Sequence, residues 1–234
     1  TLFTEIFTSF LEESLIKRAI EKQYLKVSLV NFRKNGQGKH LQVDCTPYGG
    51  GPGMVLRIEP SDQTLKEQKE FHRSNGRETH TILVTPQGQP FSQEKARELS
   101  RKKAVLTLIC GRYEGFDERL RSLVDEEISG GDFICMGGEV ITMTMIETIS
   151  RLVPDVLGNQ ESAVHESFTQ PMLEFPQYTR PASFEGMEVP EELKSGNHKI
   201  IAQWREEQAL ERTKNRRPDL LQCKTKRKLN NTDN

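Results

Sequence analysis

Three glycine-rich segments contain the residues whose types and spacing could bind a ligand. They are TPYGGGPGM (46–54), TPQGQ (85–89) with CGRYEG (110–115), and ISGGDFICMGGE (128–139). Glycine permits positive φ angles and lets a ligand approach the backbone, although a tight turn is the simpler explanation for any single loop. Two segments directly follow apolar runs, and ligands of open α/β sheets bind at the carboxyl ends of the strands. The pattern therefore predicts a site built from several loops.

These loops do not match the common nucleotide-binding motifs. A phosphate-binding P-loop needs GxxxxGK followed by Ser or Thr, and the chain has no such motif. A dinucleotide-binding fold needs GxGxxG after its first strand, and GGGPGM does not provide it. The usual loop of Rossmann-type methyltransferases is missing there as well. Any nucleotide handling therefore uses a different architecture.

The elements that must position the loops alternate between two kinds. Short apolar runs rich in β-branched residues predict strands of a sheet covered on both faces, at 26–31, 81–84 and 104–109. Apolar residues near helical spacing predict a helix over 5–22, and the segments 92–103 and 140–152 are also interpreted as helices. This alternation predicts an α/β domain with a mainly parallel sheet and helices on both faces.

Beyond Pro154 the periodicity stops, and it returns as an amphipathic helix over 198–216. We therefore expect an α/β domain over 1–154, a flexible interdomain linker over 155–170, and a small helical domain with a basic tail over 171–234. The tail is part of a cluster of eight basic residues between Arg212 and Lys228. Such a cluster suits phosphate contacts, although a solvated tail is the commoner explanation.

Composition excludes several classes of protein. The 234 residues suit one or two domains, and Lys+Arg 33 against Asp+Glu 34 leaves a net charge of -1. No apolar run approaches the ~20 residues of a membrane-spanning helix, and the N-terminal stretch, which is interrupted by glutamates, is not typical of a signal peptide. The four cysteines are scattered, which favours a reducing, cytoplasmic setting and argues against a zinc cluster.

Eight motifs in a fixed order make the reading more specific. They are PYGGGPGM (47–54), PQGxxFxQ (86–93), LICGRYEGFDER (108–119), DEEISxGD (125–132), GGE (137–139), QYTRP (177–181), SGNH (195–198) and RRPDLL (216–221). Together they resemble the bacterial tRNA (guanine-N1)-methyltransferases of the SPOUT superfamily. The resemblance covers essentially the whole chain before the basic tail.

The resemblance implies a SPOUT-type, trefoil-knotted α/β domain, a flexible linker and a helical, tRNA-binding C-terminal domain. It implies a homodimer whose active site lies between the subunits. The implied reaction transfers the methyl group of S-adenosylmethionine to N1 of the guanine at position 37 of tRNA. The resemblance also implies assistance by magnesium (Mg2+), although the sequence shows no dedicated metal-ligand cluster.

By the same resemblance, three loops hold the cofactor, largely through backbone groups. The matching residues are Thr85, Pro86, Gln87, Gly88, Gly111, Tyr113, Glu114, Gly130, Gly131, Asp132, Phe133, Ile134, Cys135, Gly137 and Gly138. For RNA, Tyr48, Gly50 and Met54 belong to the PYGGGPGM loop, where a flipped guanine could stack, and core packing is the alternative for Met54. The expected contacts of the C-terminal domain to RNA are His198, Arg205, Arg216 and Arg217.

Two residues match the catalytic positions. Guanine N1 carries a proton at neutral pH, and its loss places negative charge on O6, so a general base and a cation would both help. The family's proposed base is an aspartate of the linker, and Glu166 in HESF (165–168) matches it; an ordinary loop glutamate is the alternative. Arg151 matches the family arginine that steadies O6 or the base, and its alternative role is a helix C-terminal charge. His165 is a less favoured base.

The chain departs from the family pattern at a few further positions. Gly130 replaces the usual Ile, Phe133 replaces Tyr, Ile141 stands where GGE is followed by Leu-Pro, and Asp155 replaces Gly. The first three change the walls of the cofactor pocket, which predicts changed affinity before lost activity. Two rival functions are a SPOUT methyltransferase of ribosomal RNA, disfavoured by PYGGGPGM, QYTRP and RRPDLL, and an RNA-binding relic without activity, supported only by Glu166.

Overall fold

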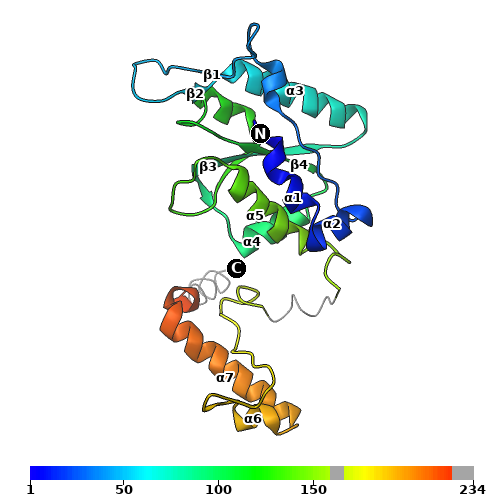
Figure 1. Cartoon of the computed structure of the whole chain (residues 1–234), viewed down its shortest axis with the longest axis vertical. Helices are drawn as coiled ribbons and strands as arrows, with labels where there is room; N and C mark the ends of the chain where they lie inside the picture. The colour runs from blue at the N-terminus through cyan, green and yellow to red at the C-terminus, as the bar shows by residue number, and fades with distance from the viewer. Residues whose placement is uncertain (159–165, 223–234) are drawn as a thin grey trace, which may run out of the picture. The chain divides into compact units, whose positions relative to one another are not determined.

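The computed structural model describes residues 1–158 and 166–222 (Figure 1). The chain divides into two compact units, Thr1–Gly158 and Asn159–Asn234, and each is described by itself. Within the described residues, no helix is both long and apolar enough to cross a lipid bilayer.

The N-terminal unit is built around a parallel sheet of three strands in the order β4-β3-β5. The long central strand β3 (Thr79–Pro90) pairs along its first half with β4 (Val105–Cys110), from Thr79 opposite Val105 to Val84 opposite Cys110. On its other side β3 pairs with the short strand β5 (Glu126–Ser129). The predicted strands at 81–84 and 104–109 are confirmed, and so is the parallel sheet.

Helices cover both faces of this sheet, as predicted, because successive strand side chains point to opposite faces (Figure 1). On one face the strands pack against α4 (Gln93–Ser100) and α5 (Glu139–Ser150), in a buried cluster of Ile82, Val84, Ile128, Leu99 and Met145. On the other face α3 (Ile58–Ser74) and the 3-10 helix η3 (Glu118–Leu123) bury Leu65, Leu83, Ile109 and Leu120. Burying each such side chain stabilises the unit by about 1.5–3 kcal/mol.

Two predictions for the first thirty residues are wrong. The single helix expected over 5–22 is divided into η1 (Thr4–Phe7), α1 (Thr8–Leu11) and α2 (Ser14–Glu21). The interruption precedes α2, where Ser14 has a φ of 54°, outside the right-handed helical region. Residues 26–31, expected to form a strand, adopt no strand. Residues 26–30 instead line an apolar groove of about 480 Å³ beside β4, and none of the predicted cofactor residues lines it.

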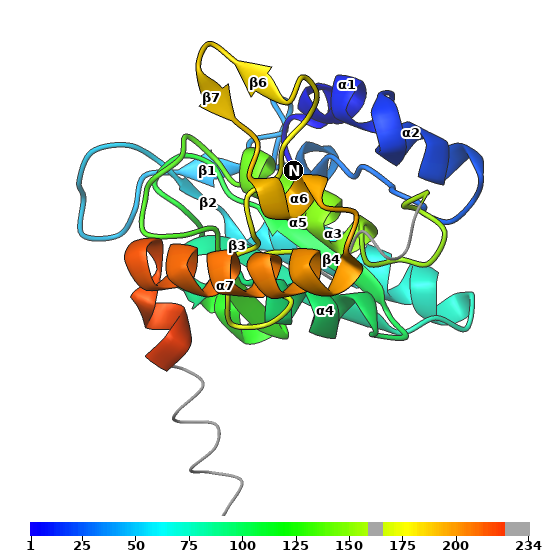
Figure 2. The same ribbon diagram turned by 90° about the horizontal axis from the view of Figure 1, so that it is seen from below.

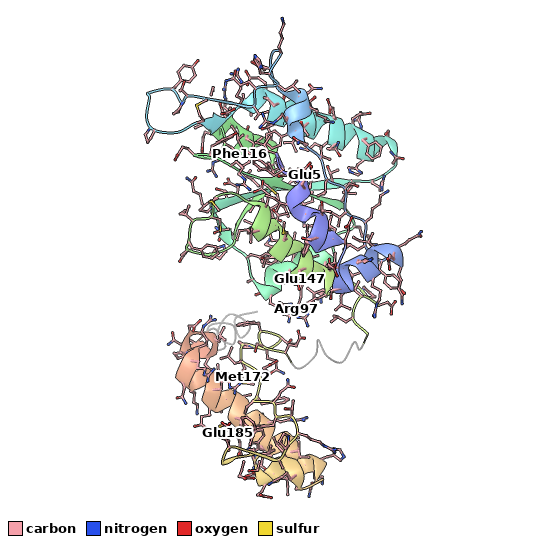
Figure 3. All side chains as sticks on the ribbon, viewed as in Figure 1. Glu5, Arg97, Phe116, Glu147, Met172 and Glu185 are labelled. Atoms are coloured by element: carbon pink, nitrogen blue, oxygen red, sulfur yellow. The ribbon has the colours of Figure 1, made fainter. Side chains whose placement is uncertain are left out.

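A small β-hairpin carries the first glycine-rich loop. The 3-10 helix η2 (Phe32–Asn35) precedes β1 (Asp44–Cys45), which pairs antiparallel with β2 (Val55–Leu56). In Figures 1 and 2 the loop between the two strands projects away from the rest of the unit. A buried cluster of Leu2, Phe32, Val43 and Leu56 anchors the hairpin. Phe116, labelled in Figure 3, packs against this cluster and against the one beneath α3.

The C-terminal unit combines a short hairpin with helices. The hairpin consists of β6 (Ser183–Phe184) and β7 (Met187–Glu188) (Figure 2), and α6 (Glu191–Lys194) follows it. Helix α7 (His198–Arg216) confirms the predicted helix, and the Asn197 side chain caps it by accepting from the Lys199 N–H at 3.1 Å. A further helical segment begins at Pro218, and proline suits the first turn of a helix because it needs no N–H donor there. The basic tail after residue 222 lies outside the described residues.

Candidate functional site

The predicted cofactor-binding residues lie where the three parallel strands end. Residues 85–88 follow the first half of β3, residues 111–115 follow β4, and residues 130–138 follow β5. Because the strands are parallel and adjacent, their carboxyl ends meet at one edge of the sheet. The structure therefore brings the three predicted loops to that edge, while their role in binding stays a prediction.

The first loop leaves β3 and returns to it. Val84 and Gln89 both pair with Ile128 of β5, so the four residues between them lie outside the ladder. Gly88 is required where the chain returns, because a Cβ atom there would lie 2.5 Å from the main chain of Glu127 and Ile128. The loop is thus held at both ends by the same residue of the neighbouring strand.

The side chain of Arg121 holds Gln87, a residue of this first loop, in place. The Arg121 guanidinium donates to the side-chain oxygen of Gln87 and forms an ion pair with Glu127. Its Nε atom also lies 2.8 Å from a carboxylate oxygen of Glu118. Gln87 is therefore oriented by η3 and β5 as well as by its own strand.

The second loop meets the hairpin loop that is predicted to bind guanine. The Glu114 N–H donates to the carbonyl oxygen of Met54 at 3.0 Å. Gly53 leaves room for the Glu114 side chain, since a Cβ atom at residue 53 would lie 2.5 Å from Oε1 of Glu114. Tyr113, with a φ of 61°, stays half exposed. The predicted cofactor loop and the predicted guanine loop are therefore in direct contact.

The third loop exposes apolar side chains and joins the second loop through its last residues. Ile134 is 81% exposed and Met136 is 91% exposed, which is unusual for side chains of this type. The Gly138 N–H donates to the carbonyl oxygen of Gly111 at 2.9 Å, and Gly137 forms a bridge with Arg112.

Two of the departures from the family pattern lie against each other. Gly130 is followed along the chain by the start of α5, and the Ile141 side chain of that helix covers the glycine. A Cβ atom at residue 130 would lie 2.6 Å from Cδ1 of Ile141. The space that a larger residue would fill at position 130 is therefore occupied from position 141.

A buried ion pair lies beneath the second and third loops, and the sequence interpretation did not find it. Glu139, the first residue of α5, is 1% exposed, and its Oε2 lies 3.0 Å from Nε of Arg112. Both residues stand inside the quoted motifs, Arg112 in GRYEG and Glu139 in GGE. A charged residue beside a glycine in each motif was the available signal, but the pairing of two distant motifs was not visible in the sequence.

Cys110 ends β4 beside these loops. Burial raises the pKa of its thiol, which lies 3.1 Å from the Thr142 hydroxyl. The thiol therefore stays protonated at neutral pH and is a poor nucleophile.

The predicted RNA-binding residues do not form a single compact cluster. Tyr48 is fully exposed on the hairpin loop, where Gly50 has a φ of 74°. His198 and Arg216 are the first and last residues of α7, and nineteen helical residues span about 27 Å.

Aromatic rings accompany two arginines of the C-terminal unit. The guanidinium carbon of Arg205 lies 4.7 Å from the centroid of the Phe175 ring, beside a pocket of about 450 Å³. Arg217 forms an ion pair with Asp219 at 2.7 Å and lies 5.9 Å from the centroid of the Phe168 ring. Both arrangements are compatible with phosphate binding, because each guanidinium retains exposed donors.

The two predicted catalytic residues belong to different units. Arg151 is exposed directly after α5, and its N–H donates to the carbonyl oxygen of Glu147 at 3.1 Å. Glu166 is partly buried in a turn of the C-terminal unit, where its carbonyl oxygen accepts from the Thr169 N–H at 3.2 Å. Their cooperation stays a prediction. His165 lies outside the described residues.

Comparison with known proteins identifies the chain's relatives. A family model described as tRNA (guanine-1)-methyltransferase TrmD matches residues 1–223. The protein named tRNA (guanine-N(1)-)-methyltransferase from Staphylococcus haemolyticus is 52% identical over 222 residues, which cover 94% of this chain and 88% of the relative. Proteins of the same name from Syntrophotalea carbinolica and Moorella thermoacetica are 49% and 50% identical over 222 residues, covering 95% and 94% of this chain and 88% of each relative.

Proposed function

We propose, since the chain belongs to the TrmD family of tRNA (guanine-N1)-methyltransferases, that it methylates N1 of the guanine at position 37 of tRNA with S-adenosylmethionine as the donor. The observation that carries this proposal is the contact between the loop of Glu114 and the loop of Met54. That contact lies between the residues proposed for the methyl donor and those proposed for the guanine. A reaction between two bound molecules needs this proximity.

The residues of the three loops fit the proposed donor. S-adenosylmethionine, when bound, supplies a methyl group that its sulfonium already activates. Glycines such as Gly131, with a φ of 142°, let a ligand approach the main chain. Glu114 and Asp132 are exposed carboxylates in these loops, and their negative charge suits a ligand with a cationic sulfonium and ammonium group.

The protein's own part in the chemistry is to position the guanine and to take its N1 proton. In the proposal Glu166 accepts that proton, and Arg151 offsets the negative charge that develops on O6. Tyr48 offers an exposed ring on which the guanine can stack. Glutamate in place of the family aspartate adds one methylene, and about 1 Å of misplacement can cost on the order of a hundredfold in rate.

The described residues offer magnesium no dedicated set of ligands. Among residues 1–158 and 166–222, no group of three or more His, Cys, Asp or Glu side chains is arranged to hold a metal ion. The described part of the chain therefore offers no built metal site to which a step could be assigned.

The proposal includes a homodimer and the knotted SPOUT topology. Ile134, Met136 and Val140 expose apolar side chains next to the cofactor loops, at 81%, 91% and 60%. Such a patch suits a subunit interface, because apolar surface of this kind is rarely left to solvent. An active site between the subunits would place this interface beside the methyl donor. The contact of Gly138 with Gly111 agrees with a chain that passes close to its own earlier loop.

The dimer predicts a specific effect of charge in this patch. We expect Met136→Asp to shift the protein to monomers and to abolish methyl transfer, because a buried unpaired carboxylate costs several kcal/mol. Sedimentation velocity measures the shift. Phe184→Asp, at an exposed apolar residue of the C-terminal unit, is the matched control. It should leave the protein sedimenting as a dimer. A monomeric wild-type protein that is fully active would refute the proposed dimer.

The function is tested by methyl transfer to a tRNA transcript with guanine at position 37. We expect 1-methylguanosine from the wild type, and none from a transcript with adenine there or from ribosomal RNA fragments. Glu166→Asp should retain activity, whereas Glu166→Gln should lose it by about 10² or more, because the general base is gone. If Glu166→Gln were as active as the wild type, another group would be the base. Tight RNA binding without any product would support the inactive relic.

A further inference from the structure

We propose that Arg112 and Glu139 are positioning residues that hold two of the cofactor loops in their binding arrangement. This inference rests on the proposed function, because it concerns the same site. Neither residue belongs to the set expected to touch the cofactor. They instead join the loop that follows β4 to the loop that precedes α5, which also meet through the main chain at residues 111, 112, 137 and 138.

The ion pair is enclosed by the protein. Nε of Arg112 lies 3.0 Å from Oε2 of Glu139, and the side chain of Arg112 is 21% exposed against 1% for Glu139. The Thr1 hydroxyl donates to the other carboxylate oxygen at 2.8 Å. Within the described residues, neither Arg112 Nε nor Glu139 Oε2 makes an aligned hydrogen bond. Charge attraction therefore maintains this contact, and either group alone would be a buried, uncompensated charge.

The pair also explains why residue 137 is glycine. A Cβ atom at residue 137 would lie 2.4 Å from Arg112 Nε and 2.5 Å from Glu139 Oε2. The main chain of the third loop therefore passes directly over the ion pair. A displacement of the Arg112 side chain would therefore remove a packing contact beneath the main chain of this loop.

Arg112 reaches both sides of the junction. Its Nη1 donates to the carbonyl oxygen of Met136 at 3.4 Å, and its guanidinium carbon lies 4.6 Å from the centroid of the Phe3 ring. Its own main chain continues into Tyr113 and Glu114 of the second loop. One side chain thus connects the second loop, the third loop and the start of α5, where the carboxylate is fixed.

Loss of this connection should weaken cofactor binding without changing the chemical step. A loop that must be ordered by the ligand lowers affinity, because part of the binding free energy is spent on ordering. We expect Glu139→Gln and Arg112→Gln each to raise the Kd and the KM for S-adenosylmethionine about tenfold, which is a typical coupling for contacting residues. At saturating cofactor, kcat should remain within about twofold of the wild type. The lost interaction stabilises the bound ground state and the transition state equally, so its loss changes KM and not kcat.

The experiment measures the Kd for S-adenosylmethionine by calorimetry with the full chain, together with KM, kcat and the melting temperature. The Kd of the double variant Arg112→Gln/Glu139→Gln for S-adenosylmethionine should not exceed the higher of the two Kd values of the single variants. Each single substitution already breaks the ion pair, so the second adds no further loss. Glu126→Gln is the control: it removes one partner of the Lys95–Glu126 ion pair (2.9 Å), which is also partly buried but lies outside these loops. It should lower stability and leave the Kd unchanged.

Three results would overturn the inference. An unchanged Kd in folded single variants with a lowered melting temperature would give the pair a purely structural role. Independent, multiplied losses in the double variant would mean that the two residues act separately. A fall in kcat with unchanged KM would place them in the chemical step. Where a Gln variant does not fold, Arg112→Lys and Glu139→Asp replace it, and they should keep the cationic–anionic pair and lose about threefold in affinity. A wild type that binds no S-adenosylmethionine would refute the proposed function itself.

Discussion

Gly130 and Ile141 behave as one packing unit, although each is a separate departure from the family pattern. The isoleucine side chain covers the glycine at a distance that leaves no room for a Cβ atom. We expect Gly130→Ile to lower the free energy of unfolding by about 1–3 kcal/mol, because it overpacks this contact. The double variant Gly130→Ile/Ile141→Ala should be more stable than Gly130→Ile alone.

Urea unfolding of the two single variants and the double variant measures this coupling. Strict additivity of the three free-energy changes would show that the residues do not share the space. Ile141→Ala is the necessary reference, because truncating this partly buried side chain lowers the free energy of unfolding even with glycine at position 130.

At single residues, the sequence predicted positions better than partnerships. The glycines at 88, 131, 137 and 138 could be placed in loops after strands, because backbone permissiveness follows from residue type alone. The Arg112–Glu139 pair could not be predicted, since two charges in distant motifs look like two solvated side chains until the fold brings them together. The same holds for Arg121 and Gln87.

Among the elements, β5 is joined to α4 and to β3 by one carboxylate in addition to its ladder with β3. Glu126 accepts from Lys95 of α4 at 2.9 Å and contacts His80 of β3 at 2.7 Å. Burial alone raises the pKa of Glu126, but the bonds from Lys95 and His80 outweigh burial, so its pKa lies below the ordinary value of 4.5. A lowered pKa in the folded state means that the stabilisation is complete above pH 4.5 and is lost as the pH falls through the folded pKa.

Glu126→Gln should therefore lower the free energy of unfolding at pH 7 by about 1.5–3 kcal/mol, the usual contribution of hydrogen bonds to a charged group. Below pH 4.5 the difference between wild type and variant should shrink, because the wild-type carboxyl also loses its charge. Denaturant unfolding across this pH range provides the test. A difference that stays constant with pH would mean that the charge of Glu126 contributes nothing.

Element prediction failed where burial does not follow hydrophobicity. Helix α3 has no counterpart in the sequence interpretation, because its buried residues are Pro60, Ser61, Thr64 and Leu65, which give almost no apolar period. The prediction for residues 26–31 failed in the opposite direction. Their apolar composition suggested a strand, but residues 26–30 line a groove and the segment pairs with no strand. Helices α5 and α7 were predicted closely, the first by its apolar content and the second by its amphipathic period.

For the whole molecule, the division into two units separates the proposed cofactor residues from Glu166. All cofactor-binding candidates fall within Thr1–Gly158, and Glu166 falls within Asn159–Asn234. We expect a protein comprising residues 1–158 to bind S-adenosylmethionine with a Kd within about threefold of the full chain, because separate sites contribute nearly independently. It should transfer no methyl group, because the proposed base is absent.

Calorimetry and the methyl-transfer assay on the same preparation check both parts, with circular dichroism to confirm that the shortened protein is folded. Complete loss of cofactor binding by a folded protein of residues 1–158 would assign part of the cofactor site to the C-terminal unit. Methyl transfer by it would remove Glu166 from the mechanism.

Strand β3 pairs with the same residue of β5 before and after its loop, which separates the length of the loop from the register of the sheet. Because Val84 and Gln89 are both paired with Ile128, the residues between them form an insert whose length does not alter the strand register. Insertions or deletions there leave the sheet and its hydrophobic clusters in place. The residues of this loop are therefore constrained by their own contacts, such as those of Gly88 and Gln87, and by the ligand they are proposed to hold, and not by the pairing of the sheet.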